Sequence, residues 1–229
     1  GPTAGDPAGG DPAQPPAAAG AAGGRGRFGT GALAAMLAIG LLLGYALGWL
    51  TPRVTAPGDD SVEAGFARDM ITHHTQAVEI GLSAFKRSTD SAVAQLAVDM
   101  AASQQGEIGM MNAWLRNWHL DPTSSQPRMA WMPADMRQVD EDGLMPGMAS
   151  QAELARLRAA EGKALDILFL QLMIRHHLGG IHMIDAALAA TDRDEVRETA
   201  QTMKSTQDGE IAVLTSTLTR LGANPLPAN

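Results

Sequence analysis

The longest apolar stretch of the chain runs from Phe28 to Leu50, FGTGALAAMLAIGLLLGYALGWL, and carries no charge. As a helix this stretch would extend roughly 34 Å, which is enough to cross the hydrocarbon core of a bilayer. A buried core helix and a cleaved signal peptide are the alternatives. Core helices rarely run this long without a charge, and no clean A-x-A cleavage site follows. The pattern therefore favours a single transmembrane helix over residues 28–50.

The charges that flank this run predict its orientation. Arg25 and Arg27 precede it, whereas Arg53 stands alone after it and is followed by Asp59 and Asp60. Because positive residues favour the cytoplasmic side, we expect a single-pass protein of the cell membrane with a cytoplasmic N-terminus and an extracytoplasmic C-terminal domain. Residues 1–27 are rich in Gly, Pro and Ala, so we predict a disordered tail there and a short tether at 51–60.

A stripe of small residues, Gly40, Gly44 and Gly48, follows one face of the predicted membrane helix. Such a stripe lets a second helix approach closely, in a membrane protein complex or a homodimer. Glycine is also common in membrane helices that have no partner, so both interpretations stay open.

From residue 61 onward the apolar positions recur with the spacing of a helix face. Two segments, 61–115 and 164–218, repeat each other at one offset, with His73 matching His176 and Gln104 matching Gln207. Each copy reads as two helices joined by a polar turn, KRSTDS at 86–91 and TDRDE at 191–195. Two such hairpins predict an all-α fold, a four-helix bundle occupying residues 61–229.

Both copies carry a pair of adjacent histidines, His73–His74 and His176–His177, and the chain has only 6 histidines. Neighbouring residues on a helix point about 100° apart, so the two members of a pair cannot face the same way. Both faces are otherwise apolar, which predicts that each histidine of a pair faces a different helix interface.

The second helix of each hairpin carries polar residues at the level of the histidines. If the first hairpin turns at 88–89, His73 stands level with Gln104, and Met70 with Glu107; the second copy gives Gln207 and Glu210 the same places. A carboxylate on an apolar stripe is costly unless it is paired, hydrogen-bonded or bound to a metal. We therefore expect Glu107 and Glu210 to contact the histidines.

Composition narrows the function classes. The net charge of −8 and the lack of Lys/Arg blocks argue against nucleic-acid binding, and the content of 45% hydrophobic residues suffices for a packed core. The chain has no cysteine but 13 methionines, so any soft metal ligand here is a thioether.

Two interpretations of the histidine pairs remain open: a buried polar clamp that fixes helix register, or ligands for a metal, with copper favoured by the combination of imidazole and thioether. In the metal interpretation the candidate ligands on the helices are His73, His74, His176, His177, Met70, Met173, Glu107, Glu210, His182 and Met183.

The connector at 116–150 adds donors. It is polar and rich in proline, so we expect a mobile segment suited to capture and transfer of a soft metal ion, although methionines also serve as gap-fillers. Its candidate ligands are His119, Met129, Met132, Met136, Met145 and Met148.

Several segments closely resemble the bacterial DUF305 family, among them FARDMITHHTQAVEIG, SQQGEIGMMNAWL and LFLQLMIRHHLGGIHMI. The resemblance covers essentially all of 61–218 and implies a ferritin-like bundle outside the cytoplasmic membrane, with copper-associated members. Two departures matter. Ile80 occupies a position where the family usually has methionine, and Met183 keeps it in the second copy. No E-x-x-H motif occurs, which argues against di-iron chemistry and an enzyme.

The sequence thus predicts a membrane-anchored extracytoplasmic protein that sequesters or transfers Cu(I) through His and Met sites. The alternative is a non-catalytic interaction subunit of a membrane protein complex, with structural histidines.

Overall fold

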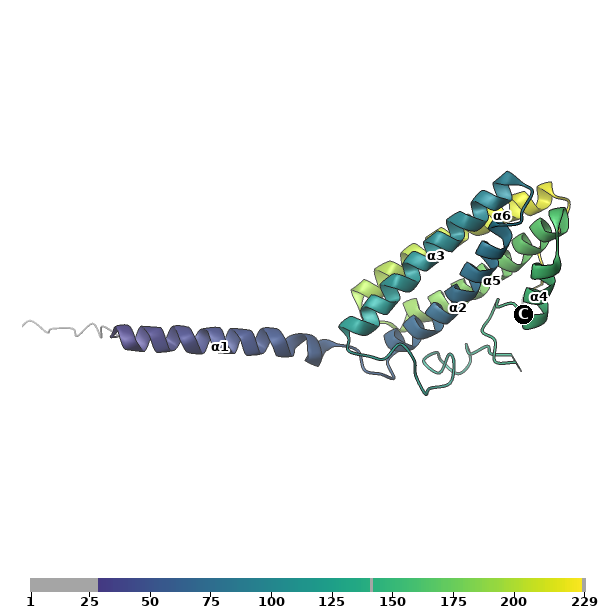
Figure 1. Ribbon diagram of the computed structural model, residues 1–229. Helices are drawn as coiled ribbons and strands as arrows, with labels where there is room; N and C mark the ends of the chain where they lie inside the picture. Colours follow the sequence, from purple (N-terminus) through teal and green to yellow (C-terminus); the bar gives the residue numbers. More distant parts are fainter. Residues whose placement is uncertain (1–28, 141, 228–229) are drawn as a thin grey trace, which may run out of the picture. The chain divides into compact units, whose positions relative to one another are not determined.

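A computed structural model describes residues 29–140 and 142–227, and its helices are labelled in Figure 1. The predictions for residues 1–27, including the flanking Arg25 and Arg27, lie outside the described residues. The described part contains six α-helices and no strand. The chain divides between Trp49 and Leu50 into two compact units.

The first helix, α1 (Thr30–Thr55), is apolar and longer than the predicted span. The segment Thr30–Thr51 is long and apolar enough to cross a membrane. A signal sequence near the N-terminus can have the same length and apolar composition. The helix continues into the predicted tether at 51–60, as far as Thr55. It ends there because Pro57 disfavours helical backbone at Ala56 and Gly58 follows.

The second unit contains the two predicted hairpins. The first consists of α2 (Val62–Phe85) and α3 (Ser91–Asn117), the second of α5 (Gly162–Ala190) and α6 (Asp194–Arg220). α2 packs against α3, α5 against α6, and α2 against α5. Figure 1 shows α3 and α6 on one side of the α2–α5 pair and the long connector on the other.

Local chemistry fixes the helix starts. Ser61 caps α2 by accepting the Ala64 N–H at 3.2 Å, and Asp90 caps α3 by accepting the N–H groups of Ala92 and Val93. The caps satisfy backbone donors that a helix start leaves without an intrahelical partner. A further short helix, α4 (Gln151–Ala159), begins with a capping box of Ser150 and Glu153. The sequence reasoning had assigned no helix there.

The core consists of two apolar clusters. One contains Phe66 and Met70 of α2 together with Met111 of α3, and the other contains Ile80 of α2 with Phe169 and Met173 of α5. The first half of α2 and the second half of α5 belong to the same cluster, which makes these two helices antiparallel. Between the two clusters lies a layer of polar side chains from the middle of each long helix.

The connector is part of the core, which corrects the expectation of a mobile methionine segment. Met129, Met132, Met145 and Met148 are buried, and Met136 is half-buried against the same apolar cluster. In a chain with 4% aromatic residues, the flexible thioethers fill the space between the loop and the helices.

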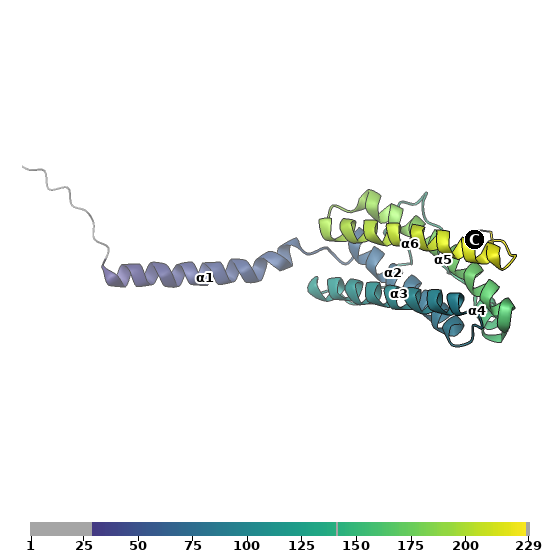
Figure 2. The same ribbon diagram turned by 90° about the horizontal axis from the view of Figure 1, so that it is seen from above.

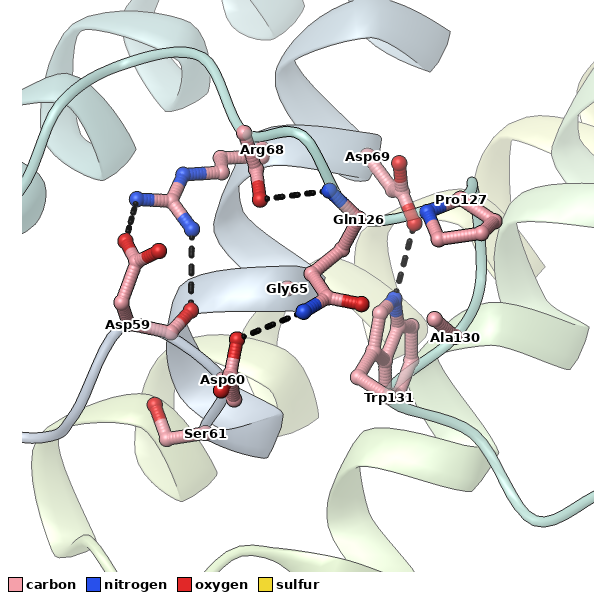
Figure 3. Close-up of a pocket in the computed structure, with 11 residues that line it drawn as sticks. Asp59, Asp60, Ser61, Gly65, Arg68, Asp69, Gln126, Pro127, Ala130 and Trp131 are labelled. Carbon is pink, nitrogen blue, oxygen red and sulfur yellow. Dashed lines mark hydrogen bonds and ion pairs between the residues drawn. The ribbon is translucent and has the colours of Figure 1, made fainter.

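Two neighbouring residues of α2 anchor this connector (Figure 3). Buried Arg68 donates to the Asp121 carbonyl and pairs with Asp59 at 2.5 Å. Asp69 accepts the Met129 N–H at 2.7 Å and the Trp131 Nε1–H at 2.9 Å. The cavity of about 260 Å³ beside them is lined by none of the histidines.

A buried histidine layer as the candidate metal site

The polar layer contains six side chains, and each is at most 2% exposed. α2 and α5 each contribute a histidine pair, while α3 and α6 each contribute a glutamine. The members are His73, His74, Gln104, His176, His177 and Gln207. The repeat therefore places equivalent residues of both copies in one layer at the centre of the bundle.

One histidine of each pair is held by a glutamate. His74 Nε2 donates to Glu107 at 2.6 Å, and His177 Nε2 donates to Glu210 at 2.6 Å. The expectation that the glutamates contact the histidines is confirmed, but Glu107 meets His74 rather than standing level with Met70. Side chains lean toward the N-terminus of their own helix, so on antiparallel helices two residues whose backbones are offset meet halfway.

The other two histidines face each other between α2 and α5. The ring centroids of His73 and His176 lie 3.8 Å apart, with the planes tilted by 37°. His73 Nε2 donates to the Pro146 carbonyl at 3.0 Å, and His176 Nε2 donates to the His73 carbonyl at 2.9 Å. The members of each pair thus face different interfaces, as the spacing predicted.

These partners determine which ring nitrogen is free. A carbonyl or carboxylate oxygen only accepts, so Nε2 carries a proton in all four rings, and a neutral ring keeps its lone pair on Nδ1. The Nδ1 atoms of His73, His74 and His177 are buried without a hydrogen-bond partner among the described residues, as are Gln104 Oε1 and both amide atoms of Gln207. Buried polar atoms without partners cost free energy and indicate a place for a ligand or water.

Burial keeps the central imidazoles neutral. Desolvation, reinforced by the neighbouring imidazole of His74, lowers the pKa of His73 to about 3. Desolvation and the charges of the other three imidazoles also lower the pKa of His176 well below its ordinary value. Neutral imidazole is the form that binds metal ions.

The sequence profile of the family described as "Domain of unknown function (DUF305)" matches residues 63–218. The chain belongs to the DUF305 family. No functionally curated protein matches it significantly.

Solved structures agree with this membership. A DUF305 protein of Streptomyces coelicolor, described as secreted, is 37% identical with a TM-score of 0.67, covering 74% of this chain and 99% of that one. A DUF305 fragment of Deinococcus radiodurans is 34% identical with a TM-score of 0.58, covering 72% and 98%. A structure described as CopM in the Cu(II)-bound form shares the fold at 23% identity and a TM-score of 0.54, covering 70% and 97%.

In the described part of the chain, no group of three or more His, Asp and Glu side chains is arranged to hold a metal ion. The available donors are Nδ1 atoms and nearby thioethers. Met70 and Met173, one turn before each pair, lie in different apolar clusters and so on opposite sides of the histidine layer.

Three further candidates fall outside the layer. His182 is half-buried and donates from Nε2 to the Met136 carbonyl at 2.8 Å, and Met183 is buried in the apolar cluster that contains Met70. His119 is exposed after the end of α3, with a φ of 60°. The structure therefore does not bring these three to the paired histidines.

Sequence reasoning missed the segment that closes the layer on the connector side, Met145–Ala149, hereafter the strap. Its Pro146 carbonyl accepts from His73, and Gln76 binds both backbone groups of Ala149 at 2.6 and 2.8 Å. Gly147 has a φ of +79°, and a Cβ there would overlap the Arg175 carbonyl. The Pro-Gly pair signals a turn, but nothing in the sequence shows that this turn covers a histidine.

Proposed function

We propose that this DUF305 protein binds copper in its histidine layer and sequesters or transfers the ion without catalysing a reaction. The observation that carries the proposal is the set of buried Nδ1 lone pairs, which have no partner while every Nε2 is held by an acceptor. The fold of a relative described in a Cu(II)-bound form supports copper as the ion.

The donor set favours Cu(I) over harder ions. Imidazole suits several transition metals, whereas thioether selects Cu(I). Met70 and Met173 are fully buried one turn from the histidine pairs, and Cu(I) tolerates the low coordination number that such a set provides. Glu107 and Glu210 act as positioning residues in this proposal, because each accepts a hydrogen bond from Nε2–H and leaves Nδ1 to the metal.

The proposed location is the extracytoplasmic face of the cell membrane, with α1 as a single-pass anchor. α1 exposes large apolar side chains along its length, including Leu37, Leu42 and Tyr45. A surface of this kind is stable in lipid rather than in water. The basic residues before α1 and the acidic residues after it support a cytoplasmic N-terminus.

The competing function is an interaction subunit whose histidines only fix helix register. The glycine stripe of α1, with Gly40, Gly44 and Gly48, would then dock the anchor against a partner complex or a second copy. Open space surrounds each of these glycines in the structure. Metal binding by the histidine layer separates this possibility from the first.

The test is a titration of the full chain in detergent with Cu(I) under reducing conditions and with Cu(II) under oxidising conditions. We expect one tight class of Cu(I) sites that is lost in the His74→Ala/His177→Ala variant. A matched control, His119→Ala/His182→Ala, removes two histidines outside the layer and should bind like the parent. Absence of binding by the parent, or equal loss in the control, would overturn the proposal.

A further inference from the structure

The histidine layer is closed on the side of the connector. The strap lies directly on α5, where a Cβ at Gly147 or at Gly179 would overlap backbone oxygen atoms. Gln76 and His73 hold the strap through hydrogen bonds from α2. An ion reaching the layer from this side would have to displace a buried, hydrogen-bonded segment.

The opposite side of the bundle carries a groove beside the layer. Residues of α3 and α6 line this groove, which has a volume of about 410 Å³. The two helices lie on the other side of the α2–α5 pair from the connector, and Figure 2 views the bundle from their side. Its wall includes Gly209, where an added Cβ would meet no atom within 4 Å. Ions and water therefore have free access to this surface.

Two groups in the wall of the groove suit a soft cation. Glu210, whose side chain is 21% exposed, contributes a carboxylate that also holds His177. Met100 of α3 contributes a thioether from the other repeat and is itself only 2% exposed. The carboxylate attracts a cation, and the thioether favours a soft one. The same carboxylate accepts a hydrogen bond from His177 Nε2 at 2.6 Å, so it connects the groove with the histidine layer.

We propose that Met100 and Glu210 form a loading site for Cu(I) in this groove, through which the ion passes to His177 in the layer. This inference rests on the proposed copper function. It assigns a role to Met100, which lies in the apolar cluster that contains Ile80 and Phe169, and it makes the two copies unequal. The equivalent methionine of the second copy, Met203, lies in the opposite apolar cluster.

The test measures loading rate and affinity separately, by stopped-flow mixing and by equilibrium titration of the full chain with Ag(I) as a redox-inert substitute for Cu(I). Met100→Leu removes the donor and keeps the apolar volume, and Met203→Leu is the matched control. We expect Met100→Leu to slow loading about tenfold, equivalent to about 1.4 kcal/mol in the barrier, while Met203→Leu loads like the parent.

A second pair of variants tests the route without touching a donor. Gly209→Leu fills the groove, whereas Gly109→Leu adds the same side chain at an open position of α3 outside the groove wall. Only Gly209→Leu should slow loading. If the parent binds Ag(I) and all four variants load at its rate, the loading site is wrong and the copper function stands. If the parent binds neither Ag(I) nor Cu(I), both proposals are overturned.

Discussion

At the scale of single residues, the two histidines of each pair have different hydrogen-bond partners. In each pair the first histidine lies between α2 and α5 and the second bonds a glutamate. All four rings carry the proton on Nε2, because each Nε2 faces an oxygen that only accepts. The glutamates thus belong to the site through their hydrogen bonds to the histidines.

Removing one of these glutamates should destabilise the bundle. Glu107→Ala leaves the Nε2–H of a fully buried histidine without an acceptor, so we expect the free energy of unfolding to fall by about 1–3 kcal/mol. Glu79→Ala is the control, because Glu79 is exposed and its ion-pair partner Arg158 is exposed as well; its expected cost is within about 0.5 kcal/mol. Urea denaturation followed by circular dichroism measures both values, and equal costs would contradict this role.

The lowered histidine pKa values predict an acid-sensitive fold. An unfolded histidine takes up a proton near pH 6.5, whereas folded His73 stays neutral down to about pH 3. The unfolded state therefore binds more protons between these limits, and stability is lost as pH falls. Each such histidine lowers the free energy of unfolding by about 1.4 kcal/mol per pH unit in this window. Denaturation curves measured from pH 7 to 4 give the free energy of unfolding at each pH. We expect this free energy to depend less steeply on pH in the His73→Gln/His176→Gln variant than in the parent.

At the scale of elements, the strap is the least expected part of the fold. It is a loop by sequence, yet its residues are buried and its backbone bonds both a histidine and a glutamine of α2. Its methionines, Met145 and Met148, are buried in an apolar cluster with residues of the helices. The glycines at 147 and 179 make this contact possible, since both positions lack room for a Cβ.

Substitutions of two glycines should separate the cost of a steric clash from the cost of a left-handed backbone conformation. Gly143 and Gly147 have φ angles of +77° and +79°, but only Gly147 faces backbone atoms of α5. Alanine should cost about 1–2 kcal/mol at Gly143, from the left-handed conformation alone. Gly147→Ala should cost about 1–3 kcal/mol more, from overpacking. Thermal unfolding of the two variants measures the difference, and similar melting temperatures would show that the strap yields easily.

At the scale of the whole molecule, the chain joins a helix with an exposed apolar surface to a bundle with a buried core. The two units divide near Leu50. Relatives of known structure are covered almost completely by about three quarters of this chain, and one is described as secreted. The bundle, which contains the matched residues 63–218, is therefore the shared part of the family.

Removal of the first helix should change localisation without unfolding the bundle. We expect the full chain to sediment with membranes and to resist extraction by salt and carbonate, because burial of α1 in lipid removes its apolar surface from water. A chain starting at Ala56 should be soluble and retain its helical signal. Cell fractionation measures the localisation, and circular dichroism measures the helical signal. If expression of the full chain yields a soluble product cleaved near residue 50, α1 is a signal sequence and not an anchor.

The sequence by itself determined the helical hairpins, their turns and the different interfaces that paired histidines face, because periodicity and repeat offset depend only on local geometry. It also indicated that Glu107 and Glu210 need a polar partner. Only the tertiary structure decided which histidine each glutamate holds, because that depends on how side chains lean across antiparallel helices. It also decided that the strap covers His73, that the connector methionines are core, and that Met70 and Met173 lie on opposite sides of the layer. These are contacts between segments far apart in the chain, and no local pattern encodes them.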